Sequence, residues 1–256
     1  MRRYLAVLLV LALPAVALFR AAGPAAAAPS PGARVPVLVE LFTSEGCSSC
    51  PPADRTLAEL ALEQPAAGAL VVPLAWHVDY WDYIGWKDPY STKASTERQQ
   101  GYAQWLGRGS LYTPQAVVDG RTDVLGSDRA ALVRAIEATA RAPRAMVTVS
   151  ARTDGDARVV DVVVGPLPAG AEASDVSLVL VENEARVEVK RGENAGRTLD
   201  HIAMARQELQ GGPVSSSVET RVSKRIPAPK RSMSVVVVVS ERLRRKVWGV
   251  GVVPLL

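Results

Sequence analysis

The sequence predicts an α/β domain followed by an antiparallel, β-rich domain of sandwich type. Near the N-terminus, an apolar strand-like run, an amphipathic helix and a second apolar run follow one another within about forty residues, which implies a parallel crossover. From about Ala145 onward the apolar period changes to two, as in short antiparallel strands. The 256 residues are 48% apolar and 22% charged. This composition fits a globular chain and excludes a disordered tail, a collagen or a polytopic membrane protein.

The first half of the α/β domain has three elements. Val35 to Thr43 is rich in Val and Leu, as in a strand buried on both faces, and Leu70 to Val78 predicts its parallel neighbour. Between the two strands, four apolar residues recur at helical spacing: Ala53, Leu57, Leu60 and Ala61. The cysteine pair therefore lies where a central strand passes into a helix.

An aromatic-rich insertion follows at about residues 79–111. Nine of the thirteen aromatic residues of the chain fall between Trp76 and Tyr112, with a helix expected over Thr96 to Leu106. The domain then closes with a predicted hairpin and a helix whose apolar stripe ends before Pro143. The hairpin strands are Gln115 to Val118 and Thr122 to Leu125; the stripe is Leu132, Val133, Ile136 and Ala140.

Short strands with intervening turns fill the second half. They are expected at residues 146–150, 158–164, 176–182, 185–190, 219–226, 234–240 and 247–253. The boundary is placed near Arg144, so the α/β domain covers residues 35–144 and the β-rich domain residues 145–256.

The N-terminal segment is typical of a secretory signal. Arg2 and Arg3 precede an apolar run from Leu5 to Phe19, and small residues suited to cleavage follow. We expect residues 1–28 to be the signal peptide, residues 29–34 a spacer, and the cleaved chain to have no stable membrane span. The predicted location is the cell envelope, periplasm or exterior, where disulfides persist. Three of the four excess positive charges are leader arginines, so the charge gives no case for nucleic acid.

The cysteine pair is the sharpest feature of the sequence. Cys47 and Cys50 are separated by two serines and followed by Pro51 and Pro52, which the first helical turn tolerates. Amides at a helix start favour a thiolate, and such pairs have a pKa of about 3.5 to 7.5 instead of about 8.5. We therefore expect an accessible, attacking Cys47 and a less exposed, resolving Cys50. A metal site and a structural disulfide closing a very short loop are the alternatives.

Several motifs together resemble one family. They lie at residues 39–54, 77–82, 85–89, 112–115, 118–120 and 191–199. On these motifs the chain resembles, from about Val35 to its C-terminus, the secreted thioredoxin-like family catalogued as domain of unknown function 1223. The resemblance implies a thioredoxin-like fold for residues 35–144. It implies no particular reduction potential, because Gly46 replaces the tryptophan that thioredoxins carry before the first cysteine.

The resemblance also implies further site residues. Pro114 is expected in a cis bond that faces the sulfurs and presents Thr113 to substrate, with an ordinary trans turn as the alternative. Tyr112 and Trp81 are the other expected substrate-binding residues, although packing explains the aromatic residues as well. Glu40 is expected to be a buried carboxylate that moves protons at the resolving cysteine; an ion pair or an edge position is the alternative.

His77 supports a different hypothesis. An imidazole just past the second strand can stabilise the Cys47 thiolate, join Cys47 and Cys50 in holding copper, or be merely structural. The leading prediction is an exported thiol–disulfide oxidoreductase that exchanges disulfides with protein thiols of the cell envelope and has no cofactor besides its own disulfide. Copper binding or transfer is one alternative, and a non-enzymatic envelope interaction protein is another. The redox partner is not indicated by the sequence.

Overall fold

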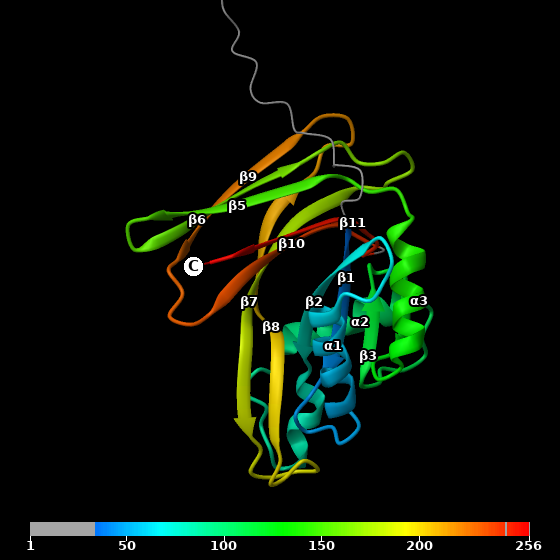
Figure 1. Cartoon of the computed structure of the whole chain (residues 1–256), viewed down its shortest axis with the longest axis vertical. Helices are drawn as coiled ribbons and strands as arrows, with labels where there is room; N and C mark the ends of the chain where they lie inside the picture. The colour runs from blue at the N-terminus through cyan, green and yellow to red at the C-terminus, as the bar shows by residue number, and fades with distance from the viewer. Residues whose placement is uncertain (1–33, 244, 256) are drawn as a thin grey trace, which may run out of the picture. The chain divides into compact units, whose positions relative to one another are not determined.

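The computed structural model describes residues 34–243 and 245–255. The predicted signal peptide and nearly all of the spacer lie outside these residues. The described chain is β-rich, with one eight-stranded mixed sheet and one three-stranded sheet (Figure 1). The elements in chain order are β1 Val35–Thr43, α1 Pro51–Glu63, β2 Ala69–His77, the 3-10 helix η1 Asp79–Ile84, α2 Lys93–Trp105, β3 Gln115–Val118, β4 Thr122–Leu125, α3 Arg129–Ala140, β5 Val147–Asp154, β6 Ala157–Val164, β7 Ser174–Glu188, β8 Thr198–Pro213, β9 Thr220–Pro227, β10 Met233–Glu241 and β11 Val247–Pro254.

The large sheet joins both halves of the chain. Its strand order is β11-β10-β7-β8-β2-β1-β3-β4, so it continues across the predicted boundary at Arg144. Residues 34–256 also form one compact unit. The α/β segment and the β-rich segment therefore share a sheet, and a division into separately folding domains stays a prediction.

β1 lies at the centre of the α/β segment. It pairs in parallel with β2, which confirms the predicted crossover, and antiparallel with β3. Because strand side chains alternate between faces, Val39 and Leu41 pack under α1 and α3, whereas Leu38 and Phe42 belong to the core on the opposite face. That second core also includes residues of α2, β7 and β10.

The three-stranded sheet has the order β5-β6-β9 and supplies a second layer (Figure 1). A separate core joins it to the far end of the large sheet, with Val160 and Val162 from β6 against Val235, Val237 and Trp248 from β10 and β11. The β-rich character expected after residue 145 is confirmed, with strands divided between the eight-stranded mixed sheet and the three-stranded sheet.

β8 is the strand that the sequence pattern did not predict. It covers 16 residues and pairs along nearly its whole length with β7. Its buried positions include His201 and Ala203, so the strand lacks the Val- and Ile-rich alternation used for prediction. The expected separate strand at residues 185–190 is the end of β7.

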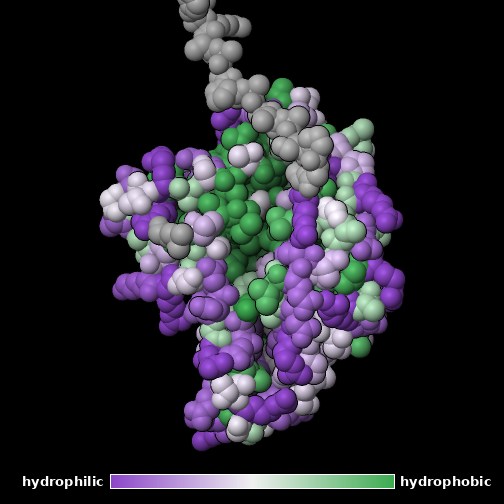
Figure 2. Space-filling view, in the orientation of Figure 1, coloured by the Kyte–Doolittle hydropathy of each residue, from purple (hydrophilic) through white to green (hydrophobic). Residues whose placement is uncertain are grey.

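An apolar groove of about 410 Å³ opens between the C-terminal half of α1 and strands β2, β7, β8, β10 and β11. Figure 2 shows it as a hollow lined by hydrophobic side chains. Along the groove, two features keep the backbone of β2 from pairing with another strand. The Gln64 side chain hydrogen-bonds to the N–H and C=O of Val71, and Pro73 has no N–H to donate. The groove lies away from the cysteine pair. No helix among the described residues combines the length and apolar character needed to cross a membrane.

Candidate redox site

The loop between β1 and α1 is shaped by local hydrogen bonds. The backbone N–H of Cys47 donates to Ser44 O at 3.2 Å, and the N–H of Cys50 donates to Cys47 O at 3.1 Å. Cys50 is the N-cap of α1, with prolines at the first two helical positions. Prolines fit there because the first amides of a helix have no intrahelical acceptor. The sequence thus places both sulfurs at the positive end of a helix.

Cys47 and Cys50 form a disulfide, with Cα atoms 5.4 Å apart. Both residues have 0% exposed surface. The expectation of an accessible Cys47 is therefore wrong for this structure. The reason is tertiary: segments far away in the sequence cover the loop.

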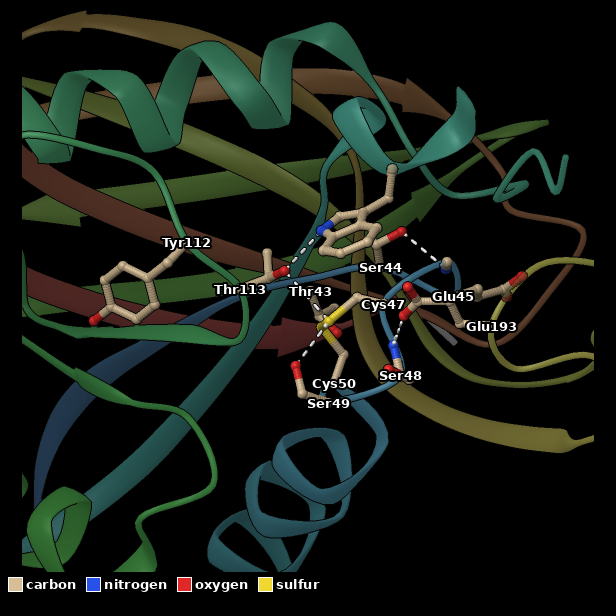
Figure 3. Close-up of a disulfide and its surroundings, with 12 residues drawn as sticks. Thr43, Ser44, Glu45, Cys47, Ser48, Ser49, Cys50, Tyr112, Thr113 and Glu193 are labelled. Atoms are coloured by element: carbon tan, nitrogen blue, oxygen red, sulfur yellow. Dashed lines mark hydrogen bonds between the residues drawn. A yellow bond between two sulfur atoms is a disulfide. The ribbon is translucent and has the colours of Figure 1, made fainter. Parts of the chain in front are cut away.

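A chain of hydrogen bonds ends on the sulfur of Cys47. The indole N–H of Trp81 donates to Thr113 Oγ1 at 2.8 Å, and the Thr113 hydroxyl donates to Cys47 Sγ at 3.3 Å (Figure 3). The hydroxyl of Ser49 lies 3.3 Å from the same sulfur. The Thr113–Pro114 bond is cis, which confirms that prediction. Thus Thr113 and Trp81 are brought to the disulfide from two other segments of the α/β half.

Gly46 allows η1 to lie against the cysteine loop. A Cβ atom on Gly46 would lie 3.0 Å from Trp81 Cβ and 3.1 Å from Trp81 O. These separations are tighter than most Cβ contacts, so a larger residue at this position would require its neighbours to move by a few tenths of an ångström. The glycine before the first cysteine thus has a structural reason, because Trp81 lies against it.

The loop between β7 and β8 holds the cysteine loop from the other side. Asn194, which is fully buried, donates through Nδ2 to Glu45 O at 2.8 Å and to Cys47 O at 3.0 Å. The N–H of Ser48 donates to a carboxylate oxygen of Glu193 at 3.0 Å (Figure 3). Residues about 145 positions apart in the sequence therefore meet at Cys47.

The two histidines of the chain lie together in the interior. Their ring centroids are 4.9 Å apart; His77 Nδ1 lies 2.7 Å from Asp88 Oδ2, and His201 Nε2 lies 3.1 Å from Glu45 Oε1. Burial alone lowers the pKa of His77, but the charge and hydrogen bond of Asp88 outweigh it, so the pKa is raised. Although burial opposes ionisation of Asp88, the charge of His77 and its hydrogen bond lower the pKa of that carboxyl. His77 is anchored by Asp88, and no contact with either sulfur is observed.

Asp54 is the acidic residue in the first turn of the helix that follows the cysteine pair. It is one turn after Cys50, and the Thr43 hydroxyl donates to its Oδ1 at 2.8 Å. The residue keeps some exposed surface, but its carboxylate is enclosed, and this burial raises its pKa. The charges of His77 and His201 act in the opposite direction.

Glu40 does not lie beside Cys50. Its carboxylate accepts from Arg98 Nε at 2.6 Å, from Trp76 Nε1 at 2.9 Å and from the Tyr102 hydroxyl. It shares the β1 face of Leu38 and Phe42, whereas α1 packs on the other face. Glu40 therefore belongs to an ion pair, which was the alternative expectation. Because it lies on the face of β1 opposite α1, the expected role in proton transfer at the resolving cysteine is wrong.

Tyr112 is also directed away from the sulfurs. Its hydroxyl donates to Asp123 Oδ2 at 2.9 Å, and its ring points away from the disulfide (Figure 3). Burial, reinforced by the bond to Asp123, raises the pKa of this phenol. Its expected substrate-binding role has no support from these contacts.

The described residues contain no set of three His, Cys, Asp or Glu side chains arranged to hold a metal ion. Cys47 and Cys50 are bonded to each other, and His77 is bonded to Asp88. The copper alternative therefore stays a prediction that no contact favours.

Comparison with known proteins identifies the family. The family model described as "Protein of unknown function (DUF1223)" matches residues 38–240. The chain belongs to this family. A crystal structure of an Agrobacterium tumefaciens protein is 31% identical, covers 87% of this chain and 95% of its own, and has a TM-score of 0.67. No functionally curated protein matches.

Other structural likenesses are weak. An oxidised superoxide reductase is 13% identical over 45% of this chain and 91% of its own, with a TM-score of 0.24. The β-glucosidase 3B of Thermotoga neapolitana, in a complex with glycerol, is 12% identical over 77% of this chain and 22% of its own, with a TM-score of 0.28. Likenesses this low carry no argument about the DUF1223 chain.

Sequence reasoning did not assign roles to Glu193, Asn194 and Asp54 at this site. The segment 191–199 was among the family motifs, and its glycines and polar residues were the available signal. Its contact with Cys47 depends on a hairpin in the distant half of the DUF1223 chain, which no local pattern specifies.

Proposed function

We propose that this DUF1223 protein is an exported thiol–disulfide oxidoreductase with a thioredoxin-like α/β segment. The observation that carries the proposal is the Cys47–Cys50 disulfide at the start of α1, with Thr113 of the cis Thr113–Pro114 bond donating to the Cys47 sulfur. The parallel β1–α1–β2 unit and the antiparallel pairing of β1 with β3 support the fold assignment. The sequence of residues 1–28 supports export.

The chemistry is an exchange of sulfur–sulfur bonds. In the reduced protein, the Cys47 thiolate attacks one sulfur of a substrate disulfide, forms a mixed disulfide and releases the other substrate sulfur as a thiolate. Cys50 then loses its proton and attacks Cys47 Sγ, which re-forms the Cys47–Cys50 bond and releases the second substrate thiolate. Two electrons pass from the protein to the substrate, and the reverse sequence oxidises a substrate dithiol.

Three groups favour the Cys47 thiolate. The hydroxyl of Thr113 donates to its sulfur, the hydroxyl of Ser49 lies within hydrogen-bond distance, and the start of α1 directs its dipole toward the pair. Asp54, with its raised pKa and its place one turn after Cys50, is the carboxylate best situated to accept the Cys50 proton. This role replaces the one expected for Glu40.

Exchange with a protein partner requires the site to open. Cys47 is fully buried, and Trp81 is joined to it through Thr113. Displacement of Trp81 breaks its bond to the Thr113 hydroxyl, so a partner strand can then approach Thr113 and the Cys47 sulfur. Protein thiols or disulfides of the cell envelope are the proposed partners.

Matched serine variants test the proposal. Reduced Cys50→Ser protein mixed with glutathione disulfide is expected to retain glutathione on Cys47, because no resolving thiol remains. Cys47→Ser is the control and is expected to retain much less. The measurement is the intact mass of the non-reduced protein. Equal, slow modification of both variants would contradict the assignment of Cys47 as the nucleophile.

A further inference from the structure

The loop between β7 and β8 makes contacts that a simple connecting turn does not need. Asn194 bonds the carbonyls of Glu45 and Cys47, the residues that flank Gly46. The next contact along the cysteine loop is the N–H of Ser48, which donates to Glu193. Two neighbouring residues of one loop thus hold two peptide groups, one on each side of the attacking cysteine: the 45–46 peptide through its C=O, and the 47–48 peptide through both its C=O and its N–H.

The loop is itself held in place by its own hydrogen bonds. The N–H of Val189 donates to Arg197 O at 2.9 Å, and the N–H of Gly196 donates to Val189 O at 2.8 Å. The guanidinium of Arg197 donates to Asn194 Oδ1 at 2.9 Å, which directs the Asn194 amide nitrogen toward the cysteine loop. The backbone that carries Glu193 is therefore fixed by the fold, and its solvent-exposed carboxylate is held by the N–H of Ser48.

Glu193 is ionised at neutral pH. Hydrogen bonds from the Ser48 hydroxyl and from the Ser48 amide lower the pKa of its carboxyl. A negative charge is thus held next to the residue that follows Cys47, and it occupies the first backbone donor after that cysteine. A thiolate on Cys47 meets this charge and cannot use that donor.

We propose that the β7–β8 loop is part of the redox site and that Glu193 lowers the reduction potential of the Cys47–Cys50 pair. The inference rests on the proposed function. Reduction takes up two electrons and two protons and converts the disulfide into two thiols, one of which ionises readily. Groups that stabilise this thiolate make the pair more oxidising. Glu193 acts in the opposite direction and opposes the effects of Thr113, Ser49 and the helix start.

This arrangement gives the C-terminal half of the chain a function at the cysteines. The sheet carries β7 and β8 beside β2, and their connecting loop reaches the end of β1 where the pair lies. The thiol chemistry comes from one half of the chain and the tuning charge from the other. Glu193 is a positioning and tuning residue, because it touches the Ser48 backbone and not the sulfur.

The test compares Glu193→Gln with Glu219→Gln in the full chain. Glu219 is an exposed carboxylate paired with Arg221 beside the three-stranded sheet, so its removal changes the net charge by the same amount. Each protein is equilibrated with glutathione buffers, and the reduced fraction is measured by alkylation and mass. Glu193→Gln is expected to shift the equilibrium constant toward the dithiol by about threefold, or about 14 mV, and Glu219→Gln to leave it unchanged.

Salt provides a readout that a purely structural role would not change. Because the Glu193 charge is exposed, raising the ionic strength from about 0.01 to 1 M shortens the screening length from about 30 to 3 Å. The potential difference between wild type and Glu193→Gln should shrink accordingly. Equal potentials for the two glutamine variants, with normal wild-type exchange, would overturn the inference and leave the proposed function standing. Failure of the wild type to equilibrate with glutathione would overturn both.

Discussion

Removal of the Asn194 side chain tests the contact between the two halves of the chain. In Asn194→Ala, the carbonyls of Glu45 and Cys47 lose their donor, and Arg197 loses an acceptor. Asn194 has no exposed surface, so water does not readily replace these bonds. The variant is therefore expected to lose stability and to loosen the cysteine loop.

The magnitude follows from the two carbonyl bonds. Each contributes about 0.5 to 1.5 kcal/mol net, and a buried acceptor left without a partner costs about 1 to 3 kcal/mol. Allowing for partial relaxation, the free energy of unfolding of the oxidised protein should fall by about 2 to 4 kcal/mol.

Asn183→Ala is the matched control. The Asn183 side chain donates near the surface from Nδ2 to Ser232 Oγ at 2.9 Å, so the loss of this bond should cost less than about 0.5 kcal/mol. Both variants are unfolded in urea with the disulfide intact, and midpoint and slope are compared with wild type. A loss in Asn194→Ala no greater than that in Asn183→Ala would refute the reasoning, because the loop would then not hold Cys47.

Two further predictions concern buried charges. Glu40→Gln removes the closer of the two carboxylates that pair with the buried guanidinium of Arg98 and leaves Glu208 at 3.3 Å, so urea unfolding should show a loss of about 3 kcal/mol, the lower end of the range for breaking a buried pair; a loss below about 1 kcal/mol would contradict the importance assigned to this pair. Because the pKa of His77 is raised above 6.5 in the folded state, its protonation stabilises the fold fully below pH 6.5, and this contribution is lost as the pH rises through the folded-state pKa. The urea midpoint at successive pH values should show this decline in wild type and a weaker one in Asp88→Asn, whereas identical profiles would exclude the pairing as its source.

Local sequence patterns predicted the elements that position the cysteines. β1 spans Val35–Thr43, as expected, because a strand buried on both faces leaves an uninterrupted apolar run. The hairpin strands β3 and β4 also match, since Asp119-Gly120 provides the turn chemistry. The cis bond at Pro114 followed from the family resemblance.

Tertiary contacts account for what the sequence did not predict. The face of β1 on which Glu40 lies depends on where α1 packs, and its partner Arg98 comes from a helix 58 residues away. Burial of Cys47 depends on Trp81 and on the β7–β8 loop, which are brought together only by the sheet. β8 was not predicted because its buried residues include His201, a polar residue that does not fit an apolar strand pattern. The partner that allows its burial, Glu45, is distant in the sequence.

The most direct test of the redox assignment is the reactivity of Cys47 in the reduced wild-type protein. Alkylation across pH, with each cysteine located by peptide mass, should show that Cys47 reacts faster than Cys50 and titrates below the ordinary thiol pKa of about 8.5. Addition of glutathione disulfide should then restore the intramolecular bond. A Cys47 that reacts no faster than an unstructured peptide thiol and does not re-form the bond would contradict the proposed oxidoreductase function.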